Sequence, residues 1–184
     1  VATSSGTYAL TQLTGDSIVI SGDAKVTATN TDSTGSIIIT SSNDVNLGET
    51  NAGAVTVVGS SDVTAKFTGD ADLKASTVTT GTGNDTLTLE DADAKFIVST
   101  GDNGNGAVDT VTVTDVADNS SIDMGAGNDV VNLADDNANG LTVDMGDGVG
   151  TANLTAAAGT EVQITFGSGT ADVLNIDTAG AHSG

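Results

Sequence analysis

Apolar residues recur along the chain in pairs spaced i, i+2, with a polar or small residue between the members of most pairs. This spacing places both side chains of a pair on one face of a β-strand. The pairs fall into two interleaved series, and each series repeats at intervals of about 18 to 26 residues. The first series consists of Ile18 and Ile20, Ile37 and Ile39, Val55 and Val57, Leu73 and Ala75, Phe96 and Val98, Ile122 and Met124, Leu141 and Val143, and Val162 and Ile164. The second consists of Val26 and Ala28, Val45 and Leu47, Val63 and Ala65, Leu87 and Leu89, Val111 and Val113, Val131 and Leu133, Leu154 and Ala156, and Leu174 and Ile176.

The repeat predicts an all-β fold built from stacked, similar units. Two short strands and two turns per period describe one coil of a parallel β-solenoid, or β-roll, in which aliphatic side chains face inward between two walls. We expect about eight coils, which at about 4.8 Å per coil give a rod about 40 Å long. The expected organisation is a lead-in segment over residues 1–14, a single solenoid domain over 15–176 and a tail or linker over 177–184.

The composition agrees with a narrow core and excludes several classes of function. Aromatic residues make up 2% of the chain, which contains no Pro, Cys or Trp. The abundance of Val, Thr, Asn and Gly favours strands and turns over a thick core with an enclosed catalytic pocket. A formal net charge of -21 disfavours nucleic acid as a partner. No apolar run approaches the roughly 18 residues that span a bilayer, so membrane insertion is not expected.

Aspartate occupies the position just before most strands of the second series. The acidic residues are almost all aspartate, since only Glu49, Glu90 and Glu161 are glutamate. Stacked coils would place such carboxylates about 5 Å apart, where two like charges repel by about 1 kcal/mol in water and by several at a lower effective dielectric constant. Cations are therefore expected along this edge. The predicted column contains Asp23, Asp44, Asp62, Asp85, Asp109, Asp129 and Asp172.

The turns that carry the later aspartates are rich in glycine and offer only oxygen ligands. Residues 81–85 read Gly-Thr-Gly-Asn-Asp and residues 125–129 read Gly-Ala-Gly-Asn-Asp, with looser versions at 101–109, 146–150 and 167–172. Glycine permits the positive φ angles that turn backbone carbonyls inward. Carboxylates and carbonyls in a flexible loop suit Ca²⁺, whereas Mg²⁺ demands a stricter octahedron.

The turns at 81–85 and 125–129 resemble the calcium-binding nonapeptide G-G-x-G-x-D-x-U-x of repeats-in-toxin (RTX) β-rolls and lack only its first glycine, and the other three turns are looser relatives. The resemblance covers about residues 79–176 and implies Ca²⁺ ions held between the turns of successive coils. Asp85, Asp109 and Asp129 match its aspartate best. The turn at 101–109 is three residues too long, the turn at 146–150 has lost its terminal aspartate, and the turn at 167–172 has one insertion. The implied metal site residues are Gly81, Gly83, Asn84, Asp85, Gly101, Asp102, Gly106, Asp109, Gly125, Gly127, Asn128, Asp129, Asp147, Gly169 and Asp172.

The remaining polar residues favour structure over catalysis. The opposite edge carries Asp16, Asp32, Asp70, Asp91, Asp93, Asp115, Asp118, Asp135, Asp136 and Asp177 without the glycine spacing, which is typical of solvated turn residues that cap backbone groups. The chain has no Arg, and its one histidine, His182, lies three residues from the end of the sequence. The paired carboxylates lack an aromatic sugar platform. We therefore expect that the protein is not an enzyme.

Three functions are compatible with a calcium β-roll. The Thr- and Ala-rich segments 18–28 and 73–85 resemble the solenoids of calcium-dependent bacterial surface-layer proteins. That resemblance implies an extracellular or cell-surface structural protein that assembles as a homo-oligomeric lattice or filament, with cell-surface polysaccharide as a further candidate partner. A second function is a calcium-dependent adhesin or an ice- or surface-binding module, since Thr86, Thr88, Thr110 and Thr112 form outward rows. The third is the RTX secretion region of a larger exported protein.

Overall fold

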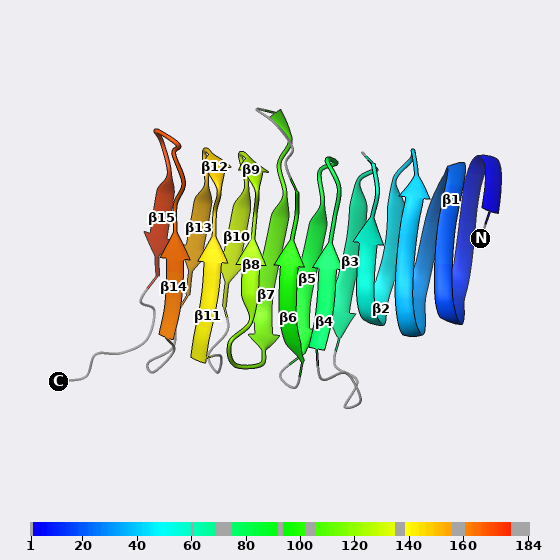
Figure 1. Ribbon diagram of the computed structural model, residues 1–184, viewed down its shortest axis with the longest axis horizontal. Helices are drawn as coiled ribbons and strands as arrows, with labels where there is room; N and C mark the ends of the chain where they lie inside the picture. Colours follow the sequence, from blue (N-terminus) through cyan, green and yellow to red (C-terminus); the bar gives the residue numbers. More distant parts are fainter. Residues whose placement is uncertain are drawn as a thin grey trace.

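The computed structural model describes residues 2–59, 61–68, 75–91, 94–101, 106–134, 139–155 and 161–177. These residues form a parallel β-solenoid of about seven turns and contain no α-helix (Figure 1). The all-β solenoid expected from the repeat is confirmed, and the number of turns is close to the eight expected. No helix in the described ranges is long and apolar enough to cross a membrane.

The strands are short except at the N-terminal end of the solenoid, where they continue around the corners. The described strands are β1 (Ala2–Ser41), β2 (Val45–Val57), β3 (Val63–Thr68), β4 (Ala75–Thr79), β5 (Thr86–Asp91), β6 (Lys95–Ser99), β7 (Thr110–Val116), β8 (Ser121–Asp123), β9 (Ala126–Gly127), β10 (Val130–Leu133), β11 (Asn139–Asp144), β12 (Asp147–Gly148), β13 (Thr151–Leu154), β14 (Glu161–Thr165) and β15 (Val173–Ile176).

Two walls run along the rod. The first wall contains β4, β6, β8, β11 and β14, and the second contains β3, β5, β7, β10, β13 and β15. Within each wall every strand pairs in parallel with its equivalent in the next coil, and the strands of the two walls run in opposite directions (Figure 1). The long strands β1 and β2 contribute to both walls. A separate two-stranded pair, β9 with β12, forms at the glycine-rich edge.

The core lies between the walls and consists of the paired aliphatic residues. Ile20, Leu47 and Leu89 are completely buried. Phe67 of the second wall meets Phe96 of the first in an edge-to-face contact with ring centroids 5.7 Å apart. Because apolar burial supplies most of the stabilisation and each coil buries its faces only against its neighbours, the coils are stable only as a stack.

Two of the predicted inward pairs are wrong. In the first wall, Val78 lies in register with the buried Val55, so the inward pair there is Ser76 and Val78. In the second wall, Ala152 lies in register with the buried Val131, so the inward pair there is Ala152 and Leu154. In both coils the sequence offers a second i, i+2 pair shifted by a few residues, and the pairing with the neighbouring strand decides between the two. Leu73 and Ala156 lie outside the described residues.

Candidate functional site

Three aspartates at the glycine-rich edge point into the solenoid. Asp85, Asp109 and Asp129 are 1%, 0% and 0% exposed, although charged residues are seldom buried so completely. Each stands two residues before an inward aliphatic residue of the second wall, as Asp85 does before Leu87. Because side chains alternate along a strand, this position faces inward. The sequence therefore buries a column of three carboxylates at the corner of the coil.

Each of these carboxylates caps the backbone of the coil that precedes it. Asp85 Oδ1 accepts a hydrogen bond from Val63 N at 2.8 Å, Asp109 Oδ1 accepts one from Asp85 N at 2.8 Å, and Asp129 Oδ1 accepts one from Asp109 N at 2.9 Å. The column thus has a structural role, because the three N–H groups would otherwise be buried at the corner without these acceptors.

The second carboxylate oxygen of two of these aspartates is buried without compensation. Asp85 Oδ2 and Asp129 Oδ2 have no hydrogen-bond partner among the described residues. The Thr80 hydroxyl lies beside Asp85, where it lowers the pKa of that acid, and it also donates to the carbonyl oxygen of Thr100 at 3.1 Å. Burial raises the pKa of Asp85 to about 6 and also raises the pKa of Asp129. The corner therefore favours a neutralised carboxylate.

Close stacking, more than backbone strain, explains several of the turn glycines. A Cβ at Gly81 would lie 2.0 Å from the Gly59 carbonyl oxygen of the preceding coil, and a Cβ at Gly127 would lie 2.6 Å from Asp129 Oδ1. Neither residue has a positive φ, whereas Gly101 and Gly125 do, at 87° and 72°. The positive φ expected in these turns is therefore found at Gly101 and Gly125 but not at Gly81 or Gly127. Glycine at these two positions makes room for a carbonyl and for the buried carboxylate.

The predicted seven-member aspartate column is wrong in its N-terminal half. Thr64 is in register with Thr86, so Val63 occupies the position of Asp85, and Asp62 aligns with Asn84. The register of Val45 with Val63 likewise places Asp44 beside Asp62 in that neighbouring column. The physical reason is the alternation of side chains, since Asp62 stands one residue before its inward anchor and Asp85 stands two residues before.

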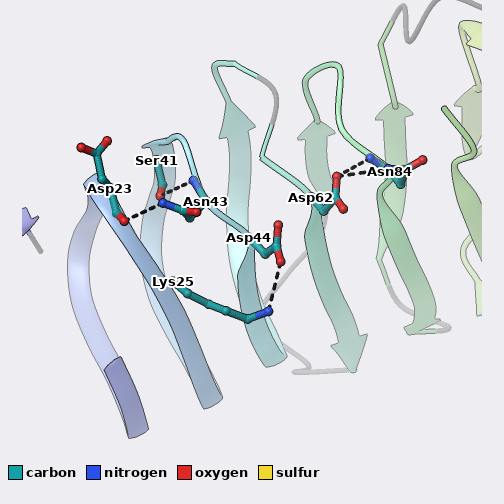
Figure 2. A network of polar contacts seen from close by, with 7 residues as sticks. All are labelled: Asp23, Lys25, Ser41, Asn43, Asp44, Asp62 and Asn84. Carbon is teal, nitrogen blue, oxygen red and sulfur yellow. Dashed lines mark hydrogen bonds and ion pairs between the residues drawn. The ribbon is translucent and has the colours of Figure 1, made fainter. Parts of the chain in front are cut away.

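An exposed polar ladder lines the outside of this edge (Figure 2). Asp62 Oδ1 accepts a hydrogen bond from Asn84 N at 2.7 Å, and Asn84 Oδ1 accepts one from Val108 N at 2.9 Å. Lys25 forms an ion pair with Asp44 at 3.0 Å, and both side chains are about half exposed. These groups hold successive turns together in solvent, where a single ion pair contributes little.

The other predicted site residues lie around the column. Asp147 sits at the exposed tip of the edge, in register with Ala126, and hydrogen bonds from the hydroxyl and backbone N–H of Ser168 lower its pKa. Asp172 is half-buried, and its Oδ1 accepts a hydrogen bond from Gly150 N at 2.9 Å. Gly150 itself holds the column position between Asp129 and Asp172, so the column is interrupted there.

The remaining residues of the predicted metal site lie in the glycine-rich turns. Gly83 and Gly169 stack against the preceding turns, and Gly127 lies against Asp129 of its own turn. Asn84 and Asn128 are exposed, and Gly106 is exposed with open space around it. Asp102 lies outside the described residues.

The residues at this edge could hold a cation only if side-chain carboxylates and backbone carbonyl oxygens bind it together. No group of three or more acidic or histidine side chains in the described ranges converges on one point. An ion at this edge would therefore be held by the buried carboxylates of Asp85, Asp109 and Asp129 together with backbone carbonyl oxygens of the glycine turns. The orphaned oxygens of Asp85 and Asp129 are suited to that role, because hard oxygen ligands are those that Ca²⁺ prefers.

Sequence reasoning missed two residues that shape this corner. Thr80 and Thr100 are buried beside the glycine turns, and the Thr100 hydroxyl donates to the Met124 carbonyl oxygen at 2.9 Å. Both immediately precede a glycine, at the position that Met124 and Met145 occupy in later coils. These two residues could have been found in the sequence, because each is a polar residue at a position where the repeat predicts an inward apolar one.

At the opposite edge, Asp118 Oδ1 accepts a hydrogen bond from Asn139 N at 2.9 Å, the capping arrangement expected for turn aspartates. Asp70, Asp93, Asp135 and Asp136 lie outside the described residues.

Comparison of the chain with protein-family models, with curated proteins and with solved structures finds no match. The structure itself shows a parallel β-solenoid, which is consistent with a β-roll.

Proposed function

We propose that this protein is an extracellular calcium-binding structural protein whose bound ions lock the coils of a self-assembling rod. The observation that carries the proposal is the buried column of Asp85, Asp109 and Asp129, in which Asp85 and Asp129 each retain a carboxylate oxygen without a hydrogen-bond partner in the described structure.

The energetic argument begins with the state of these acids at neutral pH. A buried carboxylate that is ionised and incompletely paired is strongly unfavourable. A proton could neutralise Asp85, but with a pKa of about 6 the acid is mostly ionised at pH 7. A divalent cation neutralises the same oxygens without that limit. The chain carries a net charge of -21, and cations would also reduce the repulsion between coils.

Calcium suits the site better than other metal ions. The chain has no cysteine, and the candidate ligands are oxygens of carboxylates and carbonyls in turns, which favours Ca²⁺ over Zn²⁺ or Mg²⁺. Extracellular calcium modules work at about 10⁻⁴ to 10⁻³ M, which supports a location outside the cell. When bound, the ion would supply charge neutralisation and a link between successive turns.

A structural role is favoured over an ice-binding one by the outer surface of the second wall. Thr64, Thr86 and Thr110 are in register, but the next residue in their column is Val130. The neighbouring column changes from threonine to a ladder of Asn132, Asn153 and Asn175, whose amides are joined by hydrogen bonds of 2.8 Å. A regular threonine lattice therefore ends within a few coils, whereas the stacked rod continues.

The test compares the wild-type chain with the triple variant Asp85→Asn, Asp109→Asn, Asp129→Asn. Asparagine keeps the Oδ1 acceptor that caps the preceding coil and removes the charge. Thermal unfolding is followed by circular dichroism in excess calcium and in excess chelator, with calcium binding measured by calorimetry. We expect calcium to stabilise the wild type and not the variant. A wild type that binds no calcium at millimolar concentration would rule out the proposal.

A further inference from the structure

One strip of the outer surface carries exposed aliphatic side chains. It consists of the outward-facing residues of segments 17–21, 36–40, 54–58, 75–79 and 95–99, all on the first wall, and is called here the aliphatic strip. Val19, Ile38, Val58 and Ile97 expose 43%, 36%, 60% and 46% of their surface. The other outward positions are mainly Ser and Thr, with Lys95 at one end, so the strip mixes aliphatic and hydroxyl side chains.

The strip is also free of acid. None of its five segments contains Asp or Glu, although the chain has 25 acidic residues. Farther along the same wall, Ser99 is in register with Asp123, and Asp123 with Asp144, so the acidic surface begins where the strip ends. The second wall carries Glu49 and Glu90 over the same length of the rod.

We propose that the aliphatic strip is the surface on which a second copy of this chain docks, wall against wall, about a two-fold axis parallel to the strands. Two chains of net charge -21 repel each other, and on this strip two copies can meet without opposing carboxylates. Burial of the exposed Val19, Ile38, Val58 and Ile97 would add apolar stabilisation to such a contact.

Charge complementarity at the ends of the strip fixes the arrangement. The proposed axis reverses the order of the coils and keeps the strand direction, so the first coil of one copy faces the fifth coil of the other. Lys95 begins β6 at one end of the strip, and Asp16 lies just before the buried Ile18 at the other end. Both stand at the edge opposite the glycine-rich turns. The arrangement brings Lys95 of each copy to Asp16 of the other, and isologous contacts of this kind close as a dimer.

This inference extends the self-assembly part of the proposed function and needs no calcium ligand. Sedimentation velocity over a range of protein concentrations measures the dimer. Ile38→Lys places a charge within the strip, and Thr64→Lys places the same charge on an exposed position of the second wall. We expect Ile38→Lys to weaken dimerisation by at least about tenfold and Thr64→Lys to leave it unchanged. A wild type that stays monomeric, or equal effects of the two variants, would overturn the proposal.

A charge exchange tests the arrangement with variants that leave the apolar strip intact. Asp16→Lys lowers the net negative charge and Lys95→Asp raises it, so general repulsion predicts opposite effects. The proposed contact predicts that each single variant weakens the dimer and that the double variant restores it; a double variant no stronger than the singles would contradict the arrangement. Thermal shifts with calcium on the wild type separate the two proposals, since a monomeric wild type with an intact calcium shift overturns only the docking surface.

Discussion

The same corner of the coil is built from valine in the N-terminal half and from aspartate in the C-terminal half. Val26, Val45 and Val63 are buried where Asp85, Asp109 and Asp129 are buried farther along the rod. In the valine coils, Val45 N donates to a backbone oxygen, that of Asp62, at 2.9 Å. In the aspartate coils the acceptor is a side-chain carboxylate. The fold therefore closes at this corner without acid.

This difference indicates what the aspartates add. Valine fills the core at this corner, and a backbone carbonyl oxygen of the next coil accepts the hydrogen bond from its N–H. In the aspartate coils a carboxylate oxygen takes the place of that carbonyl and introduces a charge whose burial is unfavourable. Valine is sufficient at this corner in the N-terminal coils, so the use of a destabilising buried aspartate at the same corner in later coils marks the position as a candidate for function. The two halves of the rod can therefore be compared directly, and four changes test whether the aspartate coils differ from the valine coils in this way.

The largest effect is expected when an aspartate is placed among the valines. Val63→Asp would bury a carboxylate beside Ser61 and Asp62, in a turn without the glycine pattern of 81–85. We expect a loss of about 3 to 5 kcal/mol in the free energy of unfolding, because the charge is left uncompensated. Urea denaturation with chelator measures it, and Val63→Ala controls for the lost packing. A loss no greater than that of alanine would show that the two halves tolerate acid equally.

The second effect is a pH dependence of the aspartate coils. In the cation-free chain the pKa of Asp85 rises from 3.8 to about 6 on folding, so the folded state binds a proton more tightly than the unfolded state. Stability should therefore increase as the pH falls from about 6 to about 4, by as much as about 3 kcal/mol from this residue. Calcium should reverse the slope, since acid displaces the ion. Asp85→Val should flatten the cation-free profile, and an unchanged profile would contradict the assignment.

A third change fills the gap in the column. Gly150→Asp would place a carboxylate between Asp129 and Asp172, with its Cβ 3.1 Å from the Cβ of Met145, which must shift slightly. We expect a gain of about 1 kcal/mol in excess calcium and a similar loss with chelator, because a new buried acid helps only when it is neutralised. Gly150→Ala serves as the control. The same sign in both conditions would argue against a cation-dependent column.

The smallest effect is expected on the exposed ladder outside the same edge. Asp44→Ala removes the half-exposed pair with Lys25, and surface pairs of this kind contribute about 0.5 kcal/mol or less. Thermal unfolding should change little, and equally with and without calcium. A large calcium-dependent loss would mean that the ligands lie on the outer ladder and not in the buried column.

The sequence was sufficient for the architecture and insufficient for register. The i, i+2 pairs predict the walls, the stacking and most of the core, because alternation and period are local properties. Whether Asp62 or Val63 shares a column with Asp85 depends on which residue pairs across coils, and turns of different length shift that pairing. The same uncertainty misplaced the inward pair of β4. The need for glycine at Gly127 could not be predicted either, since it arises from contact with Asp129 after folding.

The hydrogen bonds of the column all point the same way. The carboxylate that finishes each turn belongs to the coil after it, so Val63 is completed by Asp85, and Asp85 by Asp109. In this half of the rod, the backbone N–H at the corner of each coil therefore has no carboxylate acceptor until the next coil has folded against it. Each of these coils consequently depends on the one that follows it. A chain truncated within them would lose the missing coils and also the hydrogen bond that caps the corner of its last remaining coil.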